Sequence, residues 1–156
     1  MSRYFDATGD LHEVFNRLVN DRFFTFAGLK FKLLFDSKKR MSKGRLVLAS
    51  TDLVNERLRF LTADEIAPEG YDYIITVNSL AWENADEEAR ERLLSHELNH
   101  VFIDEKGKLK LLGHDVEDFA AEIHRNINNP NWALNLEQLT LAIYEQNEDQ
   151  QQEQQL

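Results

Sequence analysis

Two histidines and a glutamate, at positions 96, 97 and 100, have the types and the spacing to hold a metal ion and activate water. They lie in the segment 94–100, which reads LSHELNH. On a helix, His96 and His100 lie four residues apart on one face, so their imidazoles can converge on one ion. Glu97 lies beside them and can take a proton from water. The pattern predicts metal-dependent hydrolysis, with zinc as the expected ion.

The residues before this motif predict a helix that begins near Ala85. Asn84 and Glu87 have the spacing of a capping box, and the acidic run 86–88 places negative charge where a helix N-terminus favours it. The alternative is an exposed helix whose histidines bind nothing. Because the helix, the spacing and the glutamate occur together, we favour the metal site.

A third ligand has to come from elsewhere, since catalytic zinc sites generally use three protein ligands and leave a position for water. The segment Lys106–Lys108 predicts a turn between two short extended pieces, which returns the chain toward the first helix. A second helix is expected to begin at Gly113 and His114. We take His114 as the third ligand and keep a carboxylate, Glu117 or Glu122, as the main alternative.

These residues together carry a resemblance to a known family. The run HELNH at 96–100, followed by GHDVEDF at 113–119, resembles the phage metallopeptidases and, more distantly, the SprT and Spartan zinc proteases. In those families two helical histidines and a later Gly-His bind the metal, and the motif glutamate is the general base. The resemblance therefore implies His96, His100 and His114 as ligands of one zinc ion and Glu97 as the base. It also implies a protein or peptide substrate and a phage-encoded protein in a bacterial host.

The composition limits what the rest of the chain can be. At 156 residues and 42% hydrophobic content, we expect one domain over residues 1–144, followed by a Gln/Glu-rich tail over 145–156 that is disordered or a frayed helix. No apolar run is long enough to span a membrane, and the N-terminus lacks a secretory apolar region, so we expect a cytoplasmic protein. The absence of cysteine excludes disulfides, a thiolate zinc site and the Cys-rich module of many Spartan-like proteins.

The charge of the chain bears on its partners. A net charge of −10 argues against nucleic acid as the main partner, because phosphate binding depends on Lys and Arg. The exception is the basic run 37–45 (SKKRMSKGR), which we interpret as an exposed hairpin loop, with contact to an acidic partner as the alternative. The sequence indicates no oligomeric state.

Hydrophobic periodicity predicts a small α+β domain, with a mostly antiparallel sheet packed against the active-site helix and the helices that follow it. The resemblance implies that this domain is zincin-like. The expected elements are a helix at 11–19, a strand at 31–35 paired with 46–49, a third strand at 57–61, a strand at 71–78, the active-site helix, a helix after Gly113 and a last helix at 134–144.

Two functional hypotheses follow. The first is a zinc metallopeptidase; if the strand at 71–78 lies at the sheet edge, a substrate peptide can add to it. The candidate donors to the transition state are Tyr71, Tyr73, His124, Arg125 and Tyr144, and we assign none. The second is a metal-binding, catalytically silent domain that acts through a protein partner. Histidine and carboxylate ligands also accept divalent metals other than zinc.

Overall fold

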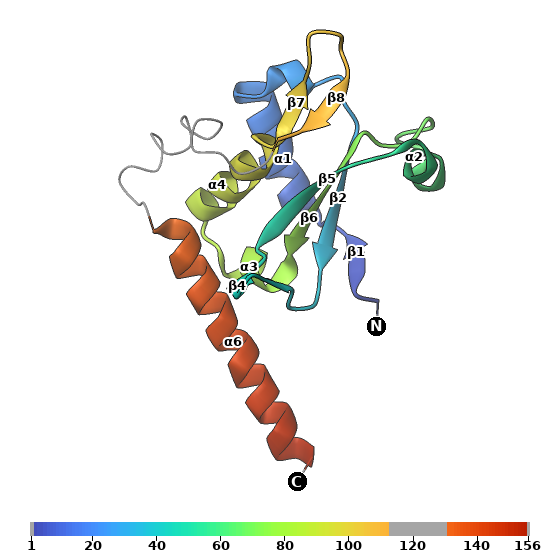
Figure 1. Ribbon diagram of the computed structural model, residues 1–156. Coiled ribbons are helices and arrows are strands. Elements are labelled where there is room, and N and C mark those ends of the chain that lie inside the picture. The colour runs from blue at the N-terminus through green and yellow to red at the C-terminus, as the bar shows by residue number, and fades with distance from the viewer. Residues whose placement is uncertain (1, 113–130, 156) are drawn as a thin grey trace.

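The computed structural model describes residues 2–112 and 131–155. A four-stranded sheet lies at its centre, and helices α1 and α4 cover one face of that sheet (Figure 1). Along the chain the elements are β1 (Tyr4–Asp6), α1 (Gly9–Asp21), the 3-10 helix η1 (Phe24–Phe26), β2 (Phe31–Asp36), β3 (Met41–Ser42), β4 (Arg45–Leu46), β5 (Ala49–Leu53), α2 (Glu56–Thr62), β6 (Tyr73–Asn78), α3 (Ser79–Asn84), α4 (Glu87–Leu98), β7 (Val101–Ile103), β8 (Leu109–Leu111) and α6 (Trp132–Gln155).

The central sheet has the strand order β1-β2-β6-β5. The inner strands β2 and β6 run parallel, with Phe35 opposite Val77, while β1 and β5 pair antiparallel on the outside. The predicted α+β domain with a mostly antiparallel sheet is confirmed. Because β6 is paired on both sides, the expectation that residues 71–78 offer an open edge to substrate is wrong.

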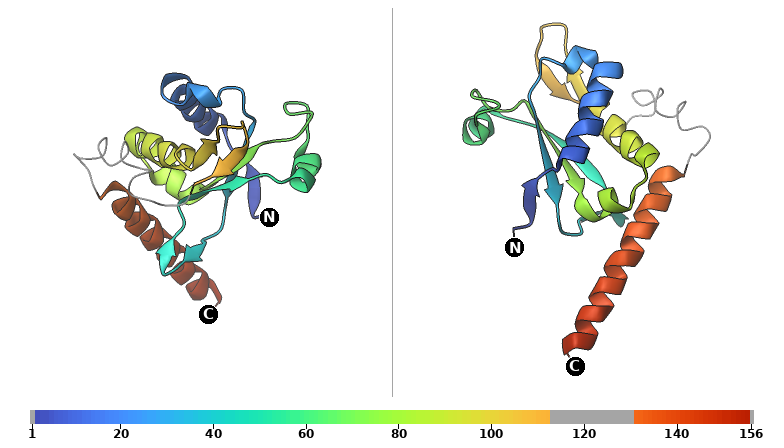
Figure 2. Two further views of the ribbon diagram at one scale, coloured as in Figure 1. Left: turned by 45° about the horizontal axis from the view of Figure 1, so that its top comes forward. Right: turned by 180° about the vertical axis from the view of Figure 1, so that it is seen from behind.

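The core lies between the sheet and the two helices that cover it. Alternate residues of β2 and β6 point to that side, among them Phe35, Ile75 and Val77, which are 0–4% exposed. They pack with Leu11 of α1 and Leu94 of α4, both fully buried. The view from behind in Figure 2 shows α1 and α4 in front of the same sheet face. This packing holds α4, which carries the motif, above the sheet.

The segment 57–61, predicted as a third strand, is part of helix α2. The Asn55 side chain accepts a hydrogen bond from the Leu58 backbone N–H, and Glu56 places negative charge in the first turn. No residue of α2 is buried, and Phe60 is 81% exposed. Local capping, rather than burial of alternate side chains, therefore determines this element.

The predicted pairing of 31–35 with 46–49 is also wrong. Lys43 and Gly44 both have positive φ and form the tight turn of a separate hairpin, β3–β4. The neighbours of β2 are β1 and β6, and the chain from Ala49 forms β5 on the far side of β6. The parallel strand β6 thus lies beside β2, in the position predicted for the segment 46–49.

The N-terminus of the motif helix differs in detail from the predicted capping box. Asn84 ends the short helix α3, and α4 is instead capped by Asp86, whose side chain accepts the Ala89 backbone N–H at 2.8 Å. Because α3 extends to Asn84, this residue cannot also cap α4. Asp86 lies two positions later, and Asp is among the preferred N-cap residues. The predicted helix is confirmed, starting at Glu87.

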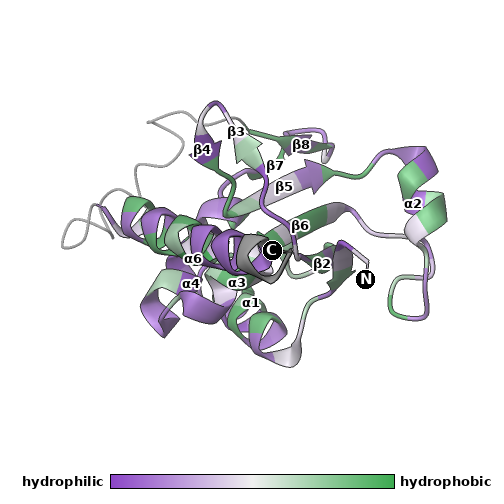
Figure 3. Cartoon of the chain, turned by 90° about the horizontal axis from the view of Figure 1, so that it is seen from below, coloured by the Kyte–Doolittle hydropathy of each residue, from purple (hydrophilic) through white to green (hydrophobic). Residues whose placement is uncertain are grey.

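The predicted last helix is confirmed as α6, which continues as far as Gln155. It packs on α3 and α4, where Leu136 lies against Ala81 and Ala89. Figure 3 shows α6 beside these helices from below, with mostly hydrophilic residues toward its end. The basic run is a hairpin tied to α6, because Arg45 pairs with Glu137 and Lys39 with Glu148. Within the described residues no helix is long and apolar enough to cross a membrane.

Candidate metal centre

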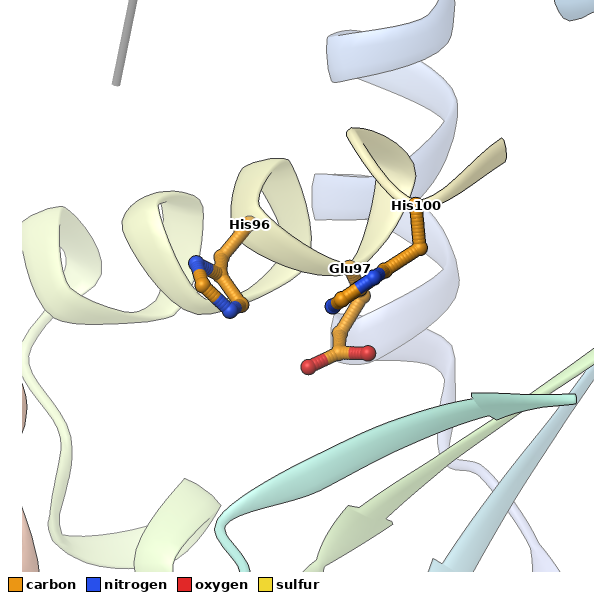
Figure 4. A group of neighbouring side chains, drawn as sticks. All are labelled: His96, Glu97 and His100. Atoms are coloured by element: carbon orange, nitrogen blue, oxygen red, sulfur yellow. The ribbon is translucent and has the colours of Figure 1, made fainter. Parts of the chain in front are cut away.

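Helix α4 places the motif between the core and the edge strand β5. Leu94 and Leu98 are fully buried and fix the rotation of the helix against α1 and the sheet. Glu97 follows on the side that faces β5, and Figure 4 shows its carboxylate pointing toward that strand, with the two imidazoles beside it. The core packing of α4 therefore aims the motif at β5.

The three motif side chains form a compact donor group. One potential ligand atom from each of His96, Glu97 and His100 lies within 4.8 Å of the other two. The two imidazole rings are 5.3 Å apart between centroids and nearly perpendicular, at 83°. Two imidazole nitrogens suit zinc and other divalent metals, and a carboxylate beside them can act as a further ligand or as a base. Thus the residues present fit a metal ion.

His100 lies just beyond the helix rather than within it. The helix ends at Leu98, Asn99 is its C-cap, and the backbone N–H of His100 bonds the Glu97 carbonyl three residues back at 3.1 Å. The expectation that one continuous helix carries both histidines is therefore corrected. The tighter last turn leads directly into β7 at Val101, and it still leaves the two imidazoles close together.

The hairpin β7–β8 determines how the His100 ring presents its nitrogens. Nδ1 of His100 lies 2.6 Å from the carbonyl oxygen of Leu112, and the Leu112 backbone N–H bonds the His100 carbonyl at 2.7 Å. A carbonyl can only accept a hydrogen bond, so Nδ1 must carry the proton. In the neutral imidazole the lone pair is then on Nε2, which is the ring nitrogen that can bind a metal.

The hairpin is itself anchored to the sheet. The hydroxyl of Tyr73, on β6, donates to the Lys110 carbonyl at 2.7 Å, and Tyr73 is fully buried. At the turn, the Asp104 carboxylate accepts the backbone N–H groups of Lys106 and Lys108. Gly107 adopts the left-handed φ of 79° that this turn requires. The predicted turn between two short extended pieces is therefore confirmed.

Glu97 is buried, at 4% exposure, in a site with one strong hydrogen-bond donor. The Thr51 hydroxyl, from β5, donates to Oε2 of Glu97 at 2.7 Å. Burial raises the pKa of Glu97, against the opposing effects of the Thr51 hydrogen bond and the nearby His100. A carboxyl with a raised pKa beside two imidazoles has the properties of a proton-transfer group.

The downstream ligand candidates lie outside the described residues. These are His114, Glu117 and Glu122, and the candidate donors His124 and Arg125 lie outside the described residues as well. The candidate tyrosines are described, and their hydroxyls have partners: Tyr71 donates to Asp64, Tyr73 to the Lys110 carbonyl, and Tyr144 accepts from Asn78. Burial and the Asp64 hydrogen bond raise the pKa of Tyr71 to about 12.

Two contributors to the site were missed by the reading of the sequence. Leu112 contributes its backbone carbonyl, and because every residue has one, the residue type cannot indicate this role. Thr51 lies 46 residues before Glu97, on a strand of mixed polar and apolar residues that the periodicity did not reveal. Neither could be found from spacing near the motif.

Comparison with known proteins identifies a family for the chain. A family model described as "Putative phage metallopeptidase" matches residues 2–144. No curated protein and no solved structure matches the chain. The match covers the described donor group and all elements that position it.

Proposed function

The chain belongs to the phage metallopeptidase family, and from that premise we propose that it is a zinc-dependent peptidase with its active centre on α4. His96 and His100 bind the ion, and Glu97 is the general base. The observation that carries this proposal is the clustering of their three donor atoms within 4.8 Å. The family match over residues 2–144 also supports a single peptidase domain spanning 1–144.

We take His114 as the third ligand. Leu112 is bonded to His100 through both its carbonyl and its N–H. His114 follows two residues later, and two residues of chain reach about 7 Å at most. Its closeness in the chain to the residue that bonds His100 supports His114 as the third ligand. Glu117 and Glu122 are the alternatives to be tested beside it.

The chain's own residues supply the proton transfers of peptide hydrolysis. When bound, zinc lowers the pKa of a water ligand and polarises the carbonyl of the scissile peptide bond. Glu97 takes a proton from the attacking water and delivers it to the leaving amine nitrogen as the C–N bond breaks. The Nδ1–H of His100, held by the Leu112 carbonyl, keeps that ring in one tautomer throughout.

The substrate is a protein or peptide, and β5 is the strand along which we expect it to lie. In the described part of the chain, β5 is the end strand of the sheet nearest α4 and pairs with β6 on one side. An extended peptide can add to such an edge through backbone hydrogen bonds. Methylating alternate backbone nitrogens of a cleaved peptide should then raise KM, whereas an unchanged KM would contradict this placement.

The proposal is tested with purified full-length protein, its metal content by elemental analysis, and a peptide library as substrate. We expect one zinc per chain and cleavage of unstructured peptides. Glu97→Gln should lower kcat by about 100-fold to 10,000-fold, the usual contribution of a general base, while zinc stays bound.

The matched control is Glu105→Gln, the same change at an exposed position in the β7–β8 turn, which should retain full activity. Equal cleavage by wild type and Glu97→Gln would refute the assigned base. Zinc bound at one equivalent without cleavage of any peptide would instead favour the catalytically silent, partner-binding domain.

A further inference from the structure

The middle of β5 places one hydroxyl directly under the Glu97 carboxylate. The Thr51 hydroxyl oxygen lies 2.7 Å from Oε2 of Glu97 and 3.3 Å from the Glu97 backbone carbonyl. Both residues are buried, with Thr51 8% and Glu97 4% exposed. The contact joins two elements that are 46 residues apart in the sequence.

The hydroxyl has a single hydrogen, so it donates to one of these two acceptors at a time. The carboxylate oxygen is the nearer acceptor and carries charge, and hydrogen bonds to charged acceptors are the stronger kind. The hydrogen is therefore directed at Oε2. Oε1 is then the carboxylate oxygen to which Thr51 does not donate.

Thr51 is a rigid donor. Its β-branched side chain has restricted rotation about χ1, and its backbone lies opposite the fully buried Ile75 in the β5–β6 ladder. Glu97, in contrast, has a flexible side chain that loses freedom when it is held. A fixed hydroxyl on the sheet can thus hold a flexible carboxylate on the helix in one orientation.

We propose that Thr51 is a positioning residue for Glu97, which turns Oε2 toward the sheet and presents Oε1 to the water at the metal centre. This inference rests on the proposed peptidase function. Its physical basis is the sensitivity of proton transfer to geometry, because displacement of a reacting group by about 1 Å can cost about 100-fold in rate.

The kinetic test compares Thr51→Val, which replaces the hydroxyl by a methyl of similar size, with Thr51→Ser, which keeps the hydroxyl. In the zinc-loaded full chain, Thr51→Val should lower kcat by about 10-fold to 100-fold with KM and zinc content unchanged, and Thr51→Ser should restore most of it. The matched control is Thr76→Val, the same change on β6 opposite Ser50, on the other face of the sheet.

A double-mutant cycle separates positioning from a general structural role. In a Glu97→Gln background, Thr51→Val should change the residual rate by less than about 2-fold, because the group it positions is no longer a base. An equal loss in both backgrounds would overturn the proposal. So would a Thr51→Ser variant as impaired as Thr51→Val.

Crystal structures of the zinc-loaded Thr51→Val and Thr51→Ser variants give a readout that does not depend on activity. The Glu97 carboxylate should leave its position, or occupy several, in Thr51→Val and keep its position in Thr51→Ser. An unmoved carboxylate in Thr51→Val overturns the inference. If wild type proves inactive on every peptide, the peptidase proposal fails, and these structures still decide whether Thr51 positions Glu97.

Discussion

Nδ1 of His100 lies 2.6 Å from the carbonyl oxygen of Leu112, so the residue that closes the β7–β8 hairpin orients a side chain that we propose as a metal ligand. The two residues are also joined by a backbone hydrogen bond from the Leu112 N–H to the His100 carbonyl. Such outer-shell partners fix the tautomer of a ligand and influence metal affinity. The position of the His100 ring therefore depends on the β7–β8 hairpin as well as on the motif.

Replacing either motif histidine by alanine should abolish tight zinc binding. His96→Ala and His100→Ala each remove a nitrogen donor, so the loss in affinity should exceed the roughly 10-fold to 100-fold that follows loss of an outer-shell partner. Competition with a chromophoric zinc chelator measures the zinc affinity of each variant. The control is His12→Ala, at an exposed position on α1, and wild-type affinity in His100→Ala would contradict the ligand assignment.

Tyr73→Phe should weaken both the fold and the metal centre. The ring remains stacked on Phe31, but the Lys110 carbonyl loses its hydroxyl donor. We expect the free energy of unfolding to fall by about 1 kcal/mol, with a smaller loss in zinc affinity because the hairpin holds Leu112 less firmly. Urea unfolding and zinc titration measure the two effects.

The control for that variant is Tyr4→Phe, since the Tyr4 side chain is 47% exposed on β1. Its stability should stay within about 0.5 kcal/mol of wild type. If Tyr73→Phe were as stable as wild type, the hydroxyl would not anchor the hairpin.

Glu137 should make the stability of the protein depend on pH. Its buried carboxylate accepts hydrogen bonds from Nε and Nη2 of Arg45 and from the Leu46 backbone N–H. The hydrogen bonds from Arg45 lower the pKa of Glu137 below 4.5. A lowered folded-state pKa contributes stability that is present above the unfolded value and lost as pH falls through the folded value. Glu137→Gln should therefore be less stable than wild type at pH 7, by about 1 kcal/mol.

The difference between Glu137→Gln and wild type should shrink as the pH falls below 4.5, which urea unfolding at several pH values will show. Glu145→Gln, at an exposed position on the same helix, should behave as wild type throughout. A difference that stays constant or grows on acidification would contradict the assigned role of the ion pair.

Zinc should stabilise the fold in proportion to its binding. A ligand that binds only the folded state, at 100 times its dissociation constant, adds about 2.7 kcal/mol to the free energy of unfolding. Thermal or urea unfolding with zinc and with a chelator should show this increment, and His96→Ala should lose it. Mg²⁺, which prefers oxygen ligands, is the control and should give no comparable increment.

The elements that could be predicted from the sequence are those built by residues close together in the chain. Asp104 and Gly107 form the β7–β8 turn from within a few residues, and the hydrophobic spacing of α1 matches its buried face. Strand partners could not be predicted in the same way. The parallel neighbour of β2 is β6, some 40 residues later, because that arrangement buries both strands under α1 and α4.

The sequence by itself determined the chemistry that this protein has available: two imidazoles and a carboxylate at helical spacing, without cysteine, in a chain of one domain's size. Only the tertiary structure decided that His100 follows the helix, that Leu112 orients its ring and that Thr51 holds Glu97. The physical reason is that these hydrogen bonds join segments 12 and 46 residues apart, whose approach depends on packing of the whole core rather than on local sequence.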